Sequence, residues 1–303
     1  MTAGTQPSRG GPGRRAGGAG QAVGQADGLG PDAAARRPRE VNPLAAVVLA
    51  PNPGPMTLEG TNSWVLRAPG HTGCVVVDPG PDEPEHLAAL GAAGPVATIL
   101  LTHGHPDHSE GAAALHELTG APVRALDPTH RLGSEGLVEG DVVAAAGIEL
   151  RVLATPGHSA DSLSFLLFGE VPAVPAADGA AVAVLTGDTI LGRGTTVVAH
   201  PDGRLADYLT SLRRLAELPT GLAVLPGHGP ELSDARGAAT YYLAHRAQRL
   251  DQVRAALAAA GVGPEQASPR AVVERVYADV DQVLWPAAEL SVRAQLDYLR
   301  EQG

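Results

Sequence analysis

The sequence contains no lysine and only one cysteine, and no stretch of it is long and apolar enough to cross a membrane. The cysteine, Cys74, cannot form an intrachain disulfide, and its position in a short β-branched run predicts a buried thiol in a core strand. A membrane-spanning helix needs roughly 18 apolar residues, and the N-terminus has no apolar segment of the kind that secretory signals carry. These absences predict a cytoplasmic protein that does not bind membranes.

Basic residues are also in deficit, because 33 acidic residues stand against 22 arginines and the formal net charge is −11. This balance argues against a protein wrapped uniformly in nucleic acid or bound to an anionic membrane, although it leaves room for a local basic patch. Alanine, glycine and proline are plentiful, so we attribute the missing lysine to coding bias and not to function.

Composition divides the chain into three parts. Residues 1–40 are rich in glycine, alanine, proline and arginine and have almost no large apolar side chain, which predicts a disordered tail. A transit peptide is the alternative, but the many glycines and prolines oppose the amphipathic helix that it needs. Because 44% of the 303 residues are hydrophobic, the rest can form one large domain, residues 41–232, and a small helical one, residues 233–303.

Apolar patterns predict short strands that alternate with helices. We expect strands at residues 44–50, 63–68, 73–78, 97–101, 122–126, 148–154, 162–168, 181–185 and 222–225. Helices are expected at 83–93, 111–118 and 205–218, and further helical patterns cover 238–260, 270–277 and 287–300. Such a mixture is typical of the α/β (α+β) class.

The most informative stretch is residues 103–108, which read His-Gly-His-Pro-Asp-His directly after the apolar run 97–101. Imidazole and carboxylate are the ligands that Zn²⁺ prefers when no thiolate is offered. In an extended loop alternate residues project the same way, so His103 and His105 can bind one ion while Asp107 and His108 turn toward a second. The alternative, in which Asp107 only caps the following helix, leaves three histidines without a role.

Three further donors follow apolar strands in the same way, each beside a glycine or a proline. His158 follows Thr-Pro-Gly, Asp188 follows Thr-Gly, and His228 stands within Pro-Gly-His-Gly. Because loops at one edge of a sheet come together, we expect these donors to converge with the 103–108 loop.

Together these motifs resemble the metallo-β-lactamase superfamily. The resemblance implies a four-layer αββα sandwich over residues 41–232, with a metal cleft at one edge of its two sheets. It implies a first ion held by His103, His105 and His158, and a second held by Asp107, His108 and His228, with Asp188 bridging the two. A hydroxide that bridges the ions would then carry out hydrolysis, and Asp107 would be the catalytic residue that orients it.

Two further segments resemble the group called β-lactamase-like protein two. They are its N-terminal signature, at residues 52–62, and part of its small winged-helix-like C-terminal domain, at residues 284–288 and the helix after them. That resemblance implies an endoribonuclease acting on single-stranded RNA. Asp188 matches the bridging carboxylate both of glyoxalase II-like thioesterases and of the superfamily's RNA-processing nucleases. The glycine-, proline- and alanine-rich stretch 169–180 departs from the group's pattern and looks like an insertion at the cleft rim.

We therefore expect a dinuclear metallohydrolase with two Zn²⁺ ions, although the same ligands can accept iron or manganese. Single-stranded RNA ranks slightly above a thioester or another acyl substrate, and a metal-stabilised scaffold without turnover is the third hypothesis. Candidate substrate contacts are Asn62, from the N-terminal signature, Arg193, which could meet an anionic group, and His200, which follows the Asp188 strand closely.

The C-terminal helices are open to two interpretations. They could form a lid or the surface of a homodimer, or they could bind substrate. Arg246, Arg249 and Arg254 fall at spacings of three and five on the predicted 238–260 helix, so they share a side of it only loosely. They are weak candidates for phosphate contacts. His245 fits no ligand pattern and is expected to have a surface or packing role.

Overall fold

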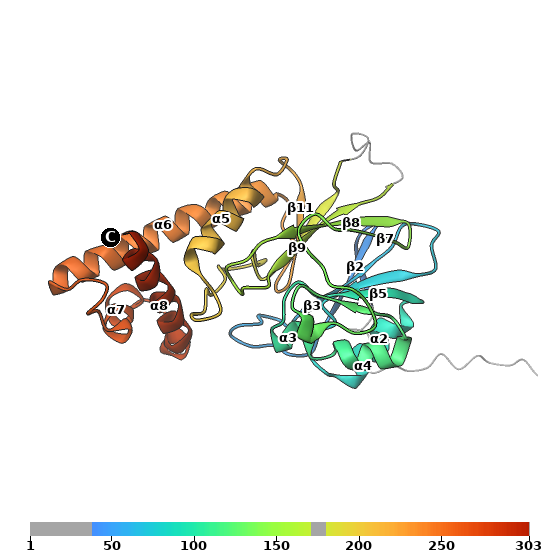
Figure 1. Ribbon diagram of the computed structural model, residues 1–303, viewed down its shortest axis with the longest axis horizontal. Coiled ribbons are helices and arrows are strands. Elements are labelled where there is room, and N and C mark those ends of the chain that lie inside the picture. Colours follow the sequence, from blue (N-terminus) through green and yellow to red (C-terminus); the bar gives the residue numbers. More distant parts are fainter. Residues whose placement is uncertain (1–37, 171–179, 303) are drawn as a thin grey trace, which may run out of the picture.

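The computed structural model describes residues 38–170 and 180–302. Most of the predicted tail (1–40) and of the predicted insertion (169–180) lies outside these residues, so both stay predictions. Two sheets lie at the centre of the molecule with helices on either side (Figure 1). Within the described ranges, no helix is long and apolar enough to cross a membrane.

The first sheet has six strands that are neighbours in chain order: β1 (Arg39–Asn42), β2 (Ala45–Leu49), β3 (Asn62–Leu66), β4 (Cys74–Val77), β5 (Val96–Leu100) and β6 (Val123–Arg124). Its central strand β4 is fully buried, as expected for its β-branched run, and Cys74 is buried in it as predicted. β4 and β5 run parallel, so the segments that follow them leave the sheet at the same edge.

The second sheet has five strands in the order β11-β10-β9-β8-β7: β7 (Val142–Ala145), β8 (Ile148–Ala154), β9 (Leu163–Phe168), β10 (Ala183–Gly187) and β11 (Ala223–Pro226). β10 runs parallel to β11, and β9 runs antiparallel to both β8 and β10. The chain therefore leaves β8, β10 and β11 in the same direction, which brings the segments with His158, Asp188 and His228 to one edge.

Three apolar layers hold the sandwich together. Trp64 and Phe165 belong to the core between the sheets. On the outer face of the first sheet, α2 (Pro84–Ala92) and α4 (Ala112–Thr119) bury Leu90 and Leu115. On the outer face of the second sheet, α5 (Leu205–Ala216) and α6 (Ala235–Ala260) bury Tyr208 and other residues. The order helix, sheet, sheet, helix confirms the predicted αββα sandwich.

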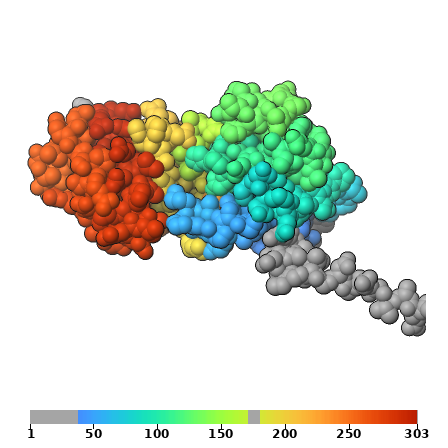
Figure 2. Space-filling view, turned by 90° about the horizontal axis from the view of Figure 1, so that it is seen from below, coloured from blue at the N-terminus to red at the C-terminus, as the bar shows by residue number. Residues whose placement is uncertain are grey.

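The C-terminal residues form a lobe at one end of the molecule (Figures 1 and 2). There α7 (Pro269–Val276), the short 3₁₀ helix η2 (Gln282–Leu284) and α8 (Trp285–Gln302) follow α6, and α7 and α8 pack on its second half around Val253, Val273 and Val292. The predicted boundary at residue 232 falls just before α6. That helix packs both on the second sheet and on the lobe, and the proposed homodimer surface stays a prediction.

Two strands depart from the sequence-based expectation. β1 begins at Arg39, inside the predicted tail, because it pairs with β2 as an edge strand. β7 was not predicted, since its four residues are partly exposed and show no long apolar run. It pairs with β8 through a tight turn in which Ala146 and Gly147 both have positive φ.

Candidate metal centre

The structure brings all seven predicted ligands together at one edge of the sandwich. Their ligand atoms fall into three overlapping groups, and within each group these atoms lie within 4.8 Å of one another. The groups are His103 with His105 and His158, then His103 with His108 and Asp188, and finally Asp107 with His108 and His228. The chain therefore offers two adjacent positions for a cation.

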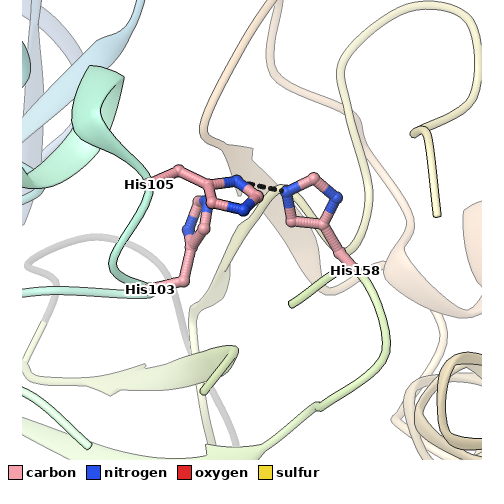
Figure 3. A group of neighbouring side chains, drawn as sticks. All are labelled: His103, His105 and His158. Carbon is pink, nitrogen blue, oxygen red and sulfur yellow. Dashed lines mark hydrogen bonds between the residues drawn. The ribbon is translucent and has the colours of Figure 1, made fainter. Parts of the chain in front are cut away.

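The first position is formed by His103, His105 and His158, whose rings meet edge to face (Figure 3). The Nε2 atom of His158 lies 3.0 Å from the Nδ1 atom of His105. The Nε2 atom of His103 is buried, and it has no hydrogen-bond partner in the part of the chain that the structure describes. A buried nitrogen left without a partner is costly, and a cation at this position would satisfy it.

The second position is formed by Asp107, His108 and His228. Nε2 of His228 lies 3.2 Å from both Nε2 of His108 and Oδ2 of Asp107. The histidine stretch is not extended throughout, because Pro106 starts the short helix α3 (Pro106–Ser109), which turns Asp107 and His108 away from His105. The N-cap residue of α3 is His105, so the alternative in which Asp107 caps the helix is wrong.

Asp188 lies between the two positions and is 8% exposed. Its Oδ2 atom is 3.7 Å from Nε2 of His158 and 3.4 Å from Nε2 of His228, and its Oδ1 atom is 3.4 Å from Nε2 of His108. Gly227 makes room for this arrangement, since a Cβ atom there would lie 2.5 Å from Oδ1 of Asp188. One carboxylate thus reaches ligands of both positions.

In the first position, the second ring nitrogen of each histidine is held by the protein. Nδ1 of His158 lies 2.8 Å from the carbonyl oxygen of Val197, and Nε2 of His105 lies 3.1 Å from a carboxylate oxygen of Asp202. Nδ1 of His103 lies 3.0 Å from the hydroxyl of Thr102. Such partners fix the orientation of a ring, so that its other nitrogen points to the metal.

In the second position, Nδ1 of His228 lies 3.1 Å from the carbonyl oxygen of Gly60, and Nδ1 of His108 lies 2.9 Å from Oδ2 of Asp78. Asp78 also accepts hydrogen bonds of 2.7 Å from the amide and the hydroxyl of Thr102. Its φ of 54° aims the buried carboxylate into the site. Sequence reasoning missed Asp78 because Asp-Pro-Gly is also a common turn, although its position after a buried strand was a usable signal.

The electrostatics of the cluster suit a cation. Burial alone would lower the pKa of His108, but the carboxylates of Asp188 and Asp78 raise it well above its usual value. Burial alone would likewise raise the pKa of Asp188, but His108 and His228 hold it well below the usual range. The pKa of His103 is kept well below its usual value, mainly by burial and to a smaller extent by the neighbouring histidines, so its ring is neutral. The site thus combines the ionised carboxylate of Asp188 with the neutral ring of His103, and it stabilises positive charge at His108. These properties fit a divalent metal ion.

The three predicted substrate contacts lie outside the ligand cluster. Asn62 is buried, and its side-chain amide donates to the carbonyl oxygens of Pro226 and Gly229, on either side of His228. It therefore supports the His228 loop from within the fold. Arg193 is exposed and His200 is half-buried, and each lies beside a carboxylate: Arg193 2.7 Å from Glu59, and His200 3.0 Å from Asp297. A substrate contact stays a prediction for all three.

Two family models match the chain. Residues 56–171 match the metallo-beta-lactamase superfamily, and residues 268–303 match the beta-lactamase associated winged helix domain. Among solved structures, a beta-lactamase domain protein from Burkholderia ambifaria superposes with a TM-score of 0.71 at 25% identity. The match covers 92% of this chain and 91% of that one.

Curated relatives extend the similarity. A beta-lactamase-like protein 2 homolog of Caenorhabditis elegans is 31% identical over 84% of this chain and 84% of its own length. An atrochrysone carboxyl ACP thioesterase of Aspergillus fumigatus is 34% identical over 72% of this chain and 66% of its own length. The chain spans 62% of the length of the lactamase-like protein adaB of Aspergillus niger. Since the C. elegans relative is similar over most of both chains, this chain belongs to the metallo-β-lactamase superfamily and has the fold of its hydrolases.

Proposed function

We propose that this protein is a dinuclear, metal-dependent hydrolase of acyl thioesters. The observation that carries the proposal is the position of Asp188, whose two carboxylate oxygens lie within 3.7 Å of ligand nitrogens from both cation positions. A shared carboxylate of this kind supports two ions close together. Zinc is the metal we favour, because all seven donors are imidazoles or carboxylates and no thiolate takes part.

The first zinc ion would be held by His103, His105 and His158, and the second by Asp107, His108 and His228, with Asp188 between them. Bound there, zinc supplies Lewis-acid activation of water and of the scissile carbonyl.

Asp107 is the ligand carboxylate best placed to handle a proton, because its side chain is 29% exposed while that of Asp188 is 10% exposed. Burial alone would raise the pKa of Asp107, but the hydrogen bond with His228 and the charge of His108 lower it. The side chain is therefore ionised near neutral pH. It can accept a hydrogen bond from the attacking water and hold that water beside the acyl carbon.

The charges around the site favour an acyl substrate over RNA. Contacts with a nucleic-acid backbone need cationic side chains that are free to neutralise phosphates. Here Arg193 lies 2.7 Å from Glu59, and Arg204 lies 2.9 Å from Glu301, so carboxylates already neutralise both. Hydrolysis of a thioester also needs no general acid for the leaving group, because a thiolate can leave without being protonated first. The A. fumigatus relative, which is 34% identical, is named as a thioesterase, and this also supports an acyl thioester substrate.

Cleavage of single-stranded RNA is the second candidate. Its support is the match of residues 268–303 to a winged helix domain, together with the similarity to the C. elegans beta-lactamase-like protein 2 homolog over 84% of both chains. The paired arginines count against it, and so does the net charge of −11.

The test is a substrate screen of the zinc-loaded protein with two matched variants. Asp107→Asn removes the charge of the ligand carboxylate, and Asp82→Asn removes that of an exposed carboxylate outside the ligand set. We expect release of thiol from acyl-glutathione, acyl-coenzyme A or acyl-carrier-protein thioesters, reduced about 100-fold or more by Asp107→Asn and unchanged by Asp82→Asn. Cleavage of labelled single-stranded RNA with no thioester activity would select the second candidate, and inactivity on both would favour a metal-stabilised scaffold.

A further inference from the structure

The two cation positions are supported from different parts of the chain. The outer partners of His105 and His158, two of the three ligands of the first position, lie on residues 189–204 between β10 and α5, which we call the bridging loop. Val197 and Asp202 of this loop contact His158 and His105, as described above. The hydroxyl of Thr196 also lies 3.3 Å from Nδ1 of His158. The second position is instead supported by Asp78 and Gly60, which belong to loops of the first sheet.

The bridging loop is itself held by α6. Arg246 of that helix is 4% exposed, and its guanidinium donates a hydrogen bond to the carbonyl oxygen of Thr196. Four residues earlier on the same helix, the hydroxyl of Tyr242 accepts a hydrogen bond of 3.0 Å from the amide of Leu191. Arg246 and Tyr242 therefore contact the bridging loop on either side of the turn at residues 192–194.

Burial of Arg246 carries a large desolvation cost, because its guanidinium is charged. Among the described residues it has no carboxylate within 4 Å, and its Nε atom has no hydrogen-bond partner. Its guanidinium lies 5.2 Å from the centre of the Tyr208 ring, a contact that offsets only part of the desolvation cost. An apolar side chain would cover the same surface without burying a charge. The hydrogen bond to Thr196, together with the polar interaction with the hydroxyl of Tyr208, thus distinguishes arginine from an apolar residue at this position, and of the two only the bond to Thr196 leads to a metal ligand.

From these contacts we propose that Arg246 is a positioning residue for the first cation position. It fixes the backbone of Thr196 and Val197, which fix the ring of His158, and so it sets the geometry of the site made by His103, His105 and His158. Arg246 has no such link to the second position, whereas the contact of Tyr242 with Leu191 leads toward it, because the amide of Gly192 donates to the carbonyl oxygen of His228. This inference rests on the proposed metal-dependent function, and it adds that one buried arginine of α6 supports one of the two cation positions and not the other.

The test measures zinc affinity at each position by competition with a chromophoric chelator, using the full chain. Arg246→Met keeps a side chain of similar length and removes both the charge and the hydrogen bond. Arg249→Met is the matched control, because Arg249 is on the same helix and lies 4.7 Å over the Tyr277 ring, and it donates to the carbonyl oxygen of Val276 rather than to the bridging loop. We expect Arg246→Met to weaken one of the two zinc equivalents about 10-fold and to leave the other within about twofold.

Arg246→Lys should recover part of the lost affinity, since an ammonium can still donate to Thr196. If Arg246→Met does not fold, Arg246→Gln, which shortens the side chain and removes its charge but keeps a polar group, should weaken the same equivalent. Equal weakening of both equivalents, no weakening of either, or the same result from Arg249→Met would overturn the proposal. A wild-type chain that binds no metal would refute the proposed function itself, whereas two wild-type equivalents unchanged by Arg246→Met would refute this inference alone.

Discussion

Asp78 offers the sharpest test of how the protein supports its metal ligands. Its buried carboxylate accepts three hydrogen bonds of 2.7 to 2.9 Å, two from Thr102 and one from His108. Asp78→Asn is the appropriate change because asparagine also tolerates the positive φ of 54°, whereas alanine would add backbone strain. The substitution therefore removes the charge and one acceptor site while it keeps the shape of the side chain and the path of the backbone.

The size of the effect can be worked out in two ways. A hydrogen bond to a charged group contributes about 1.5–3 kcal/mol and a neutral one about 0.5–1.5 kcal/mol, so weakening three bonds should lower the free energy of unfolding by about 3–4.5 kcal/mol. Loss of an outer partner of a metal ligand reduces metal affinity about 10–100-fold, which is about 1.4–2.7 kcal/mol. We therefore expect a loss of about 3–4 kcal/mol in the free energy of unfolding and of about 2 kcal/mol in the free energy of zinc binding.

The assay is chelator competition for zinc, with Asp82→Asn as a control for a change of surface charge. Because Asp78 contacts His108 directly and His103 through Thr102, both zinc equivalents should weaken, in contrast to the selective effect expected of Arg246→Met. Unfolding by urea should show the expected loss of stability in the metal-free protein. Affinities within twofold of the wild type at both positions would refute the reasoning.

Two further predictions follow from close contacts and from burial. Gly227→Ala would place a methyl group 2.5 Å from Oδ1 of Asp188 and 2.7 Å from Cε1 of His108, so we expect zinc affinity to fall at least ~10-fold, as measured by the same competition. The pKa of His245 is lowered to about 4, from 6.5 in an unfolded chain, mainly by burial and to a smaller extent by the charges of Arg246 and Arg249. Between these two pKa values the unfolded chain binds a proton at His245 and the folded chain does not. The contribution of His245 to the free energy of unfolding is therefore fully present above pH 6.5 and is lost as the pH falls toward 4. Allowing for the partial exposure of His245, the loss is about 1–2 kcal/mol. Urea unfolding of the metal-free protein at pH 7 and pH 4.5 should show a smaller loss for His245→Gln, and an equal loss in both proteins would contradict the prediction.

The metal ligands could be predicted from sequence because residue types that bind metals stand directly after predicted strands. His158, Asp188 and His228 each follow an apolar strand and stand beside a glycine or a proline, and the strand directions bring those ends to one edge. The αββα layers followed from the resemblance that these residues carry. The distances between the ligand atoms could not be predicted from sequence alone, because they depend on how the two sheets pack against each other.

Residues that support the ligands were harder to predict. Asp78 and Asn62 lie in segments that resemble ordinary turns and strands, and their roles depend on partners far away in the chain. Arg246 was a weak candidate for contacts with phosphate, but the structure buries it against the bridging loop. A helical pattern indicates which residues share a face. It does not indicate which loop will cover that face.

The central claim is that two metal ions share Asp188. The most direct test is the metal content of the purified protein, measured by mass spectrometry for the wild type and for Asp188→Asn under the same conditions. We predict about two equivalents for the wild type and about one or fewer for the variant, because the carboxylate that reaches both positions has lost its charge. A single tightly held equivalent in the wild type, unchanged by Asp188→Asn, would contradict the claim.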